Sequence, residues 1–141
     1  MRTLLDTCTF VWLVCSPDLV PPATRAFLER ETDAIVVSAA SVWELAIKRK
    51  LGKLGELSSI ARDLTAFVRE AIGTYLFEEF PMSSAHAALA GDLPLHHRDP
   101  FDRMLIAQAR IEDLIVISPD QTFDRYDAPR TYKVPAAVAK A

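Results

Sequence analysis

Four acidic side chains are the residues of this chain best suited to chemistry. They are Asp6, Glu44, Asp102 and Asp120. Each lies near a short apolar run of the kind that forms a buried strand. In an α/β fold, side chains just beyond the carboxyl ends of parallel strands meet in the crevice that binds ligands. Carboxylates gathered there repel one another unless a cation neutralises them, so the pattern predicts a divalent-metal site suited to phosphodiester hydrolysis.

Each acid also has an ordinary structural explanation. Asp6 could cap the helix that follows it, and Asp120 could be a turn residue. Glu44 fits a capping box with Ser41, in which its carboxylate would bond a backbone amide at the helix start. If Ser38 is the cap instead, which we favour, Glu44 lies a turn further into the helix. A structural role for all four acids together is the less favoured interpretation.

The segment around Asp102 carries the same ambiguity. Asp99 is the better helix cap, because Pro100 suits the first helical position. Asp102 falls in the first turn, where the helix dipole favours a negative charge whatever else the residue does.

Apolar periodicity and turn residues predict strands that alternate with helices. The predicted strands cover residues 3–6, 34–37, 74–80 and 114–117, with a fifth over 131–134 at the sheet edge. The predicted helices cover residues 9–14, 22–32, a segment from 38 or 41 to 50, 57–72, a short segment from 83 and a longer one from 100. The fourth of these helices is expected to stop at Gly73. The fold class is therefore α/β, with a mainly parallel sheet of four to five strands covered on both faces.

Composition sets the broad class of protein. The chain has 141 residues, half of them hydrophobic and 25% charged, which suits one domain over residues 1–141. No apolar run approaches the about 18 residues of a membrane span, and no cleavable leader opens the chain, so we expect a cytoplasmic protein. Cys8 and Cys15 are too far apart on one predicted helix for a disulfide. Both are expected to be reduced core thiols.

Charge gives a mixed signal about nucleic acid. The net charge of −3 provides no overall attraction, but a metal ion would reverse the sign of the acidic pocket. Basic residues are also clustered, in Lys48-Arg49-Lys50 with Lys53 and in Arg98, Arg103 and Arg110. These clusters fit solvated helix faces and phosphate contacts alike.

Other candidate residues are weaker. His86 is expected on a helix surface, and His96 and His97 in an exposed loop within reach of substrate. No local pattern matches a Ser-His-Asp nucleophile, a phosphate-binding glycine loop or a paired-Cys zinc site. A phosphohydrolase of the haloacid dehalogenase kind needs a second Asp two residues after the first, and that place is Cys8.

Four blocks of the sequence resemble the PIN domain, and most closely the VapC-type toxins of bacterial toxin–antitoxin pairs. They are residues 4–7 (LLDT), 38–48 (SAASVWELAIK), 97–109 (HRDPFDRMLIAQA) and 117–120 (ISPD) followed by Phe123. The blocks follow the family's order from end to end of the chain, and the third is the most specific.

This resemblance implies a three-layer α/β/α domain with an acidic pocket that binds Mg²⁺ or Mn²⁺. It also implies an endoribonuclease that acts on RNA, forms a homodimer and is silenced by a cognate antitoxin protein. The four acids named above match the family's acidic positions, with Asp124 in reserve for the fourth. Residues that match supporting positions are Thr7, Ser118, Arg103 and Asp99.

Within such a site, we expect Asp6 to anchor the metal, and Asp102 and Asp120 to complete its ligands. Glu44 would bind through water or position the attacking water. Two alternatives stay open: a non-catalytic PIN-like module that binds RNA or protein, and a housekeeping RNA-processing nuclease.

Overall fold

A five-stranded sheet forms the centre of the molecule in the computed structural model, which describes residues 2–55, 62–126 and 131–133. The strands are β1 Arg2–Leu5, β2 Ala34–Ser38, β3 Glu78–Phe80, β4 Ile115–Ser118 and β5 Thr131–Lys133. Their order is β3-β2-β1-β4-β5, and every neighbouring pair is parallel. The predicted parallel sheet, with its fifth strand at the edge, is confirmed.

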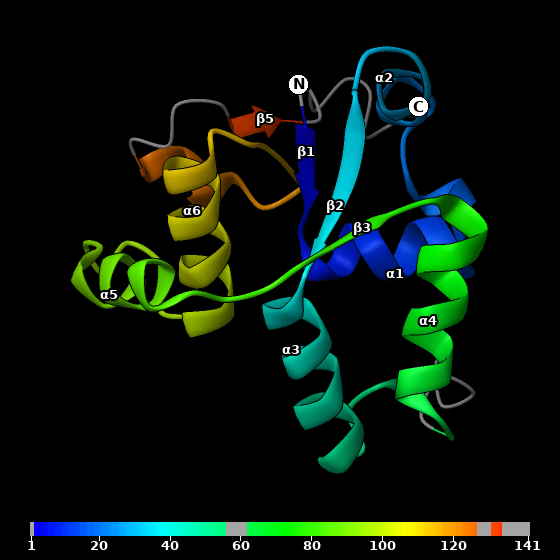
Figure 1. Ribbon diagram of the computed structural model, residues 1–141, viewed down its shortest axis with the longest axis horizontal. Coiled ribbons are helices and arrows are strands. Elements are labelled where there is room, and N and C mark those ends of the chain that lie inside the picture. The colour runs from blue at the N-terminus through cyan, green and yellow to red at the C-terminus, as the bar shows by residue number, and fades with distance from the viewer. Residues whose placement is uncertain (1, 56–61, 127–130, 134–141) are drawn as a thin grey trace.

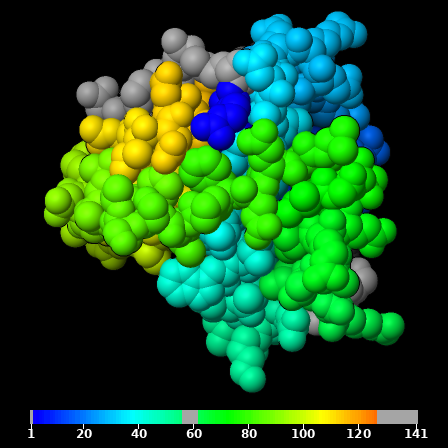
Figure 2. All heavy atoms as spheres, in the orientation of Figure 1, coloured from blue at the N-terminus to red at the C-terminus, as the bar shows by residue number. Residues whose placement is uncertain are grey.

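Helices cover this sheet on two sides. They are α1 Thr7–Cys15, α2 Pro22–Arg30, α3 Ala39–Lys50, α4 Leu64–Tyr75, α5 Ser84–Asp92 and α6 Pro100–Glu112, with 3₁₀ turns η1 Pro17–Leu19 and η3 Gln121–Arg125. In Figure 1, α1 and α4 lie on one side of the strands and α5 and α6 on the other. Figure 2 shows the same division at the surface, with α3 projecting below both groups. None of the helices in the described part of the chain has the length and apolar character to span a bilayer.

Two hydrophobic cores separate the three layers. Adjacent residues of a strand point to opposite faces, so Leu4 packs in one core with Leu105 of α6 while Leu5 packs in the other with Phe10 of α1 and Val68 of α4. The other central strands alternate in the same way. This arrangement is the predicted α/β/α sandwich.

The strand order reverses at β1. The chain moves from β1 outwards through β2 to β3, and then crosses to the opposite side of β1 to form β4. Leu5 pairs with Ile117, so the carboxyl ends of β1 and β4 lie side by side. Such a reversal leaves a crevice in which ligands bind. The β2 end contributes as well, because Ser38 caps α3 by accepting a hydrogen bond from the Ala40 amide at 3.0 Å, as we favoured.

The third strand is shorter than predicted. Residues 78–80 form β3, whereas Thr74 and Tyr75 belong to α4, which continues through Gly73. The helix ends only at Leu76, which adopts a left-handed conformation with φ of 56° and still donates its amide to Ile72. The described part of α4 begins at residue 64; the expected start at 57 falls outside the described residues, as does residue 134 at the end of β5.

Two predictions of burial were wrong. Cys8 and Cys15 are unpaired, as expected, but both are exposed, because α1 turns Phe10 and Val11 inwards instead. His86, predicted on a surface, is only 2% exposed. Its Nδ1 accepts the Ser83 amide at 3.0 Å and its Nε2 bonds Glu112 at 2.9 Å, so it completes the capping box of α5.

Candidate functional site

A pocket of about 320 Å³ gathers the predicted acids at the carboxyl ends of the strands. Its carboxylates are Asp6, Glu44, Asp99, Asp102 and Asp120. They come from the end of β1, from α3, from the start of α6 and from the end of β4. The structure thus brings all four sequence-predicted acids together, and adds Asp99. Lys48 also lines this pocket.

Asp6 is held by two neighbours. It is 5% exposed, and it caps α1 by accepting the Thr9 amide on Oδ1 at 2.8 Å. Its Oδ2 accepts the Ser118 hydroxyl at 2.6 Å. The Asp120 amide in turn donates to the Ser118 hydroxyl oxygen at 3.1 Å. Ser118 therefore couples the acid that follows β1 to the acid that follows β4.

Glu44 is also buried and fully engaged. Thr7 donates its hydroxyl to Oε1 at 2.7 Å, and the Lys48 ammonium lies 2.7 Å from Oε2 one helical turn later. The Glu44 side chain is 8% exposed whereas that of Lys48 is 45% exposed, so the lysine reaches from solvent over the pocket. Burial would lower the pKa of Lys48, but its hydrogen bond and ion pair with Glu44 raise it, and the side chain stays charged.

Asp102 and Asp120 meet at a histidine. His97 Nε2 lies 2.8 Å from Oδ2 of Asp102 and 2.9 Å from Oδ2 of Asp120. Asp99 caps α6 beside them, with Oδ1 accepting the Phe101 amide at 2.9 Å. The cap that the sequence assigned to Asp99 is confirmed, and the same residue still lines the pocket.

The carboxylates of the pocket destabilise one another's charged forms. Burial, followed by the charges of Asp99, Asp6, Glu44 and Asp120, raises the pKa of Asp102 to about 8. Burial also raises the pKa of Asp6, against the opposing hydrogen bonds of Ser118 and Thr9. Buried carboxylates crowded in this way hold protons more tightly than free carboxylates do, and a bound metal ion would take the place of those protons.

Asp120 differs from these two acids. Burial acts to raise its pKa, but hydrogen bonds from Thr122 and from His97 outweigh it, and the pKa of Asp120 is lowered. Its side chain is 41% exposed. Asp120 therefore supplies a charged carboxylate at the open side of the pocket.

The donor set fits a hard divalent cation. Ligand oxygens of Glu44, Asp99 and Asp102 lie within 4.8 Å of one another. Mg²⁺ and Mn²⁺ prefer such oxygen donors. Cys8 at the pocket wall does not add a sulfur ligand: burial, and then the charge of Asp6, raise the pKa of its thiol to about 12, although the residue as a whole is exposed.

Three of the sequence-predicted residues do not line this pocket. Ser118 lies behind it and hydrogen-bonds Asp6 at 2.6 Å. Arg103 points to the other side of α6, where its Nη2 donates to the carbonyls of Ala90, Gly91 and Leu93 at 2.8–3.1 Å. Asp124 is an exposed residue of η3 and does not line the pocket. Of the two candidates for the fourth acidic position, Asp120 lines the pocket and Asp124 does not.

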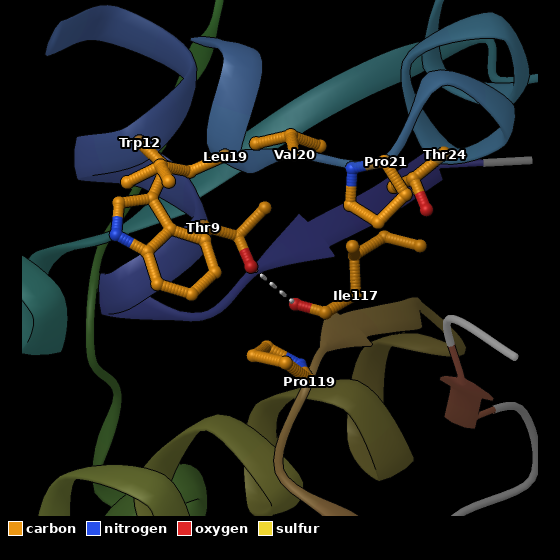
Figure 3. Close-up of a pocket in the computed structure, with 8 residues that line it drawn as sticks. All are labelled: Thr9, Trp12, Leu19, Val20, Pro21, Thr24, Ile117 and Pro119. Atoms are coloured by element: carbon orange, nitrogen blue, oxygen red, sulfur yellow. Dashed lines mark hydrogen bonds between the residues drawn. The ribbon is translucent and has the colours of Figure 1, made fainter. Parts of the chain in front are cut away.

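A second cavity lies against the first but has a different character. It has a volume of about 150 Å³ and adjoins the acidic pocket at Pro119, which lines both. Figure 3 shows its apolar walls, with the Trp12 ring on one side and Val20, Pro21 and Ile117 on the other. None of the residues that line it carries a carboxylate.

The model of the PIN domain family matches residues 3–129. The chain belongs to the PIN domain family. PIN domains are generally nucleases, and those nucleases use divalent metals. The acidic pocket described above lies within the matched range, at the reversal point of the PIN sheet.

Solved structures share this PIN fold over almost their whole length. VapBC2 of Rickettsia felis, bound to a promoter DNA fragment, is 16% identical with a TM-score of 0.66, over 95% of this chain and 99% of that one. DNA-bound VapBC of Salmonella typhimurium is 18% identical with a TM-score of 0.64, over 94% and 98%. FitAcB of Neisseria gonorrhoeae is 21% identical with a TM-score of 0.60, over 96% and 98%. No curated protein matches the sequence with statistical significance.

Sequence reasoning missed His97 as part of the site. It expected an exposed loop residue, whereas the His97 side chain is 15% exposed and bridges two acids. Its place in the HRDPFD block was the only signal. Lys48 was identified only as one member of a basic run, because spacing along α3 does not by itself reveal which lysine faces Glu44.

Proposed function

We propose that this PIN domain is a metal-dependent endoribonuclease that acts as the toxin of a toxin–antitoxin pair. The observation that carries the proposal is the convergence of Asp6, Glu44, Asp102 and Asp120 from four distant segments on one pocket. Burying and crowding these carboxylates disfavours their charged forms, as the raised pKa of Asp102 indicates. Features that break local rules without a structural benefit are expected at functional sites.

The residues of the pocket have distinct proposed tasks. Asp6, fixed by Ser118 and Thr9, would anchor the metal, with Asp102 and Asp120 completing its ligands. Bound Mg²⁺ or Mn²⁺ would lower the pKa of a coordinated water and neutralise the phosphate oxygens. Glu44 would position the attacking water.

Lys48 would contribute from the rim of the pocket. Its ammonium is charged, partly exposed and tethered to Glu44 at 2.7 Å. An RNA phosphate that enters the pocket passes this group, so we propose that Lys48 pairs with a nonbridging phosphate oxygen. It would offset the net charge of −3, which gives the chain as a whole no attraction to RNA.

The proposed partner is a cognate antitoxin protein. Two proteins with the same fold were solved as DNA-bound VapBC, and a neighbour from Klebsiella pneumoniae is described as a toxin–antitoxin complex. We propose by analogy that this chain forms a homodimer, acts in the cytoplasm where its RNA substrate lies, and is held inactive by such a partner.

Cleavage of RNA by the purified protein tests the nuclease proposal. Asp6→Asn is expected to lower Mg²⁺- or Mn²⁺-dependent cleavage by about 100-fold or more while the fold is kept. Asp124→Asn is the matched control, because it removes a nearby acid that lies outside the pocket. Retained cleavage by a clean Asp6→Asn preparation would refute the assignment. Loss with Asp124→Asn but not with Asp120→Asn would move the fourth position to Asp124.

Growth on expression without a partner tests the toxin proposal separately. Wild type is expected to arrest growth and Asp6→Asn is not. Efficient cleavage of RNA in vitro with normal growth at good expression would favour a housekeeping RNA-processing nuclease. Absence of both Mn²⁺ binding and cleavage would favour a non-catalytic binding module.

A further inference from the structure

His97 bridges two acids of the pocket, Asp102 and Asp120. Its Nε2 is 2.8 Å from Asp102 Oδ2 and 2.9 Å from Asp120 Oδ2. The three groups lie close enough to hold an ion among them, within 4.8 Å of one another. His97 therefore has two possible relations to a bound metal: it ligates the ion itself, or it orients the carboxylates that do.

The other ring nitrogen decides between these roles. The Asp99 amide donates a hydrogen bond to His97 Nδ1 at 3.2 Å. A nitrogen that accepts an N–H carries no proton, so the proton of the neutral ring sits on Nε2. An Nε2 that holds a proton has no lone pair for a metal. Ligating histidines show the reverse pattern, in which the second nitrogen donates to a carbonyl or carboxylate.

The position of His97 agrees with an orienting role. Asp102 and Asp120 line the acidic pocket, whereas His97 does not. This difference is what an orienting residue behind the metal ligands would show.

The surrounding contacts hold this ring in place. The His97 amide donates to the Tyr126 hydroxyl oxygen at 2.7 Å, and that hydroxyl donates to the Pro94 carbonyl at 2.7 Å. Phe123 packs against the imidazole with ring centroids 6.0 Å apart and planes at 79°. The loop before α6 is therefore tied to the segment after β4, and the Nε2–H is fixed in direction before any ligand arrives.

We propose that His97 is a positioning residue, which donates its Nε2–H to Asp102 and Asp120 and so orients their remaining oxygens towards a bound divalent cation. The inference rests on the proposed metal-dependent function. It specifies that the metal receives oxygen ligands alone and that His97 acts through the carboxylates.

Two isosteric substitutions test this role. Gln places an amide N–H near the position of Nε2, whereas Asn places it near Nδ1, too short to reach the carboxylates. Titration calorimetry with Mn²⁺ is expected to show affinity about 10- to 100-fold weaker for His97→Asn. The affinity of His97→Gln should stay close to that of the wild type. The exposed neighbour His96→Asn is the control and should bind normally.

Thermal unfolding of the metal-free variants guards against a purely structural explanation. A structural role for the imidazole alone would weaken His97→Gln and His97→Asn alike, both in unfolding temperature and in affinity. Equal affinity losses in the two variants would therefore overturn the proposal, as would normal Mn²⁺ binding by folded His97→Asn.

Electron spin-echo spectroscopy of bound Mn²⁺ tests ligation directly. We expect no coupling to a directly coordinated nitrogen in the wild-type protein. A nitrogen coupling that disappears in His97→Gln would overturn the inference and leave the nuclease proposal intact. Failure of the wild-type protein to bind Mn²⁺ at all would instead refute the proposed metal-dependent function, and the role of His97 with it.

Discussion

Two polar regions of this PIN domain lie on opposite sides of α6 and are built differently. At the contact of α5 with α6, Arg103 donates to three carbonyls at the end of α5, and buried His86 is bonded by Ser83 and Glu112. In the acidic pocket, five carboxylates share the ammonium of Lys48 and the ring of His97.

The polar groups of the α5–α6 contact stabilise the fold, whereas those of the acidic pocket are arranged to bind a ligand. Buried polar groups that satisfy one another support the fold. Those that leave like charges facing each other destabilise it until a ligand arrives. Substitutions in the α5–α6 contact should therefore lower stability, whereas substitutions in the pocket should relieve strain and abolish binding.

The largest effect on stability is expected from Arg103→Ala. Several hydrogen bonds from a charged group to the α5 carbonyls would be lost, at a cost of about 3 kcal/mol in the free energy of unfolding. Urea denaturation measures this loss, with Arg110→Ala in the last turn of α6 as the control. The folded variant should bind Mn²⁺ normally. If the variant keeps its stability but loses RNA cleavage, Arg103 acts with the pocket. That result would contradict the division between a stabilising α5–α6 contact and a binding pocket.

Metal binding should stabilise the wild-type protein by a similar amount. Mn²⁺ at 100 times its dissociation constant is expected to add about 2.7 kcal/mol to the unfolding free energy, and chelation should remove it. Asp6→Asn should lose this increment, and Arg103→Ala should keep it. The rise in unfolding temperature with Mn²⁺ concentration provides the measurement. An equal rise in Asp6→Asn would show that the ion binds elsewhere.

Asp102→Asn should stabilise the metal-free protein. The folded carboxyl has a pKa of about 8, whereas the ordinary value for aspartate is 3.8, so the folded state binds more protons between these values. Its unfolding free energy therefore falls as the pH rises from roughly 4 to 8. Asparagine removes this dependence, so the unfolding free energy of the variant relative to the wild type should rise with pH across this range, by up to about 1.4 kcal/mol per pH unit. Denaturation in chelator at both pH values measures it. A variant less stable at pH 8 would mean that the Asp102 charge is favourable without metal.

The smallest effect is expected at the rim of the pocket. Lys48→Ala should reduce RNA cleavage about tenfold at low salt, and by less at high salt, because exposed phosphate contacts are screened. Lys50→Ala, an exposed lysine of the same helix that does not line the pocket, is the control. Equal losses in the two variants would indicate a diffuse basic surface rather than a specific contact.

The sequence predicted the fold where periodicity and capping agree. Buried runs marked β1, β2 and β4, and Asp99-Pro100 marked the start of α6. The prediction failed near β3, since Gly73 looked like a helix end and Thr74 like a strand residue. Helix α4 instead continues to Tyr75 although residues 73–76 are exposed, and Leu76 takes the left-handed conformation that glycine usually supplies.

Within the site, the sequence predicted which acids gather but not what holds them. The sequence alone shows which carboxylates follow strands, and the carboxyl ends of parallel strands lie at one edge of the sheet. The partners of Arg103 and His97 depend on how α5, α6 and the loop before α6 pack together. Such contacts have no sequence period, so the arginine was assigned to the site and the histidine to solvent.

The hydroxyl bridge at Ser118 also bears on synthesis. Asp6 leaves the ribosome first, but its Oδ2 partner arrives only when β4 inserts beside β1, more than a hundred residues later. A nascent chain that stops short of residue 115 carries three of the four acids without the strand that locks the first one in place. The acidic pocket is therefore complete only once β4 has been made and has paired with β1.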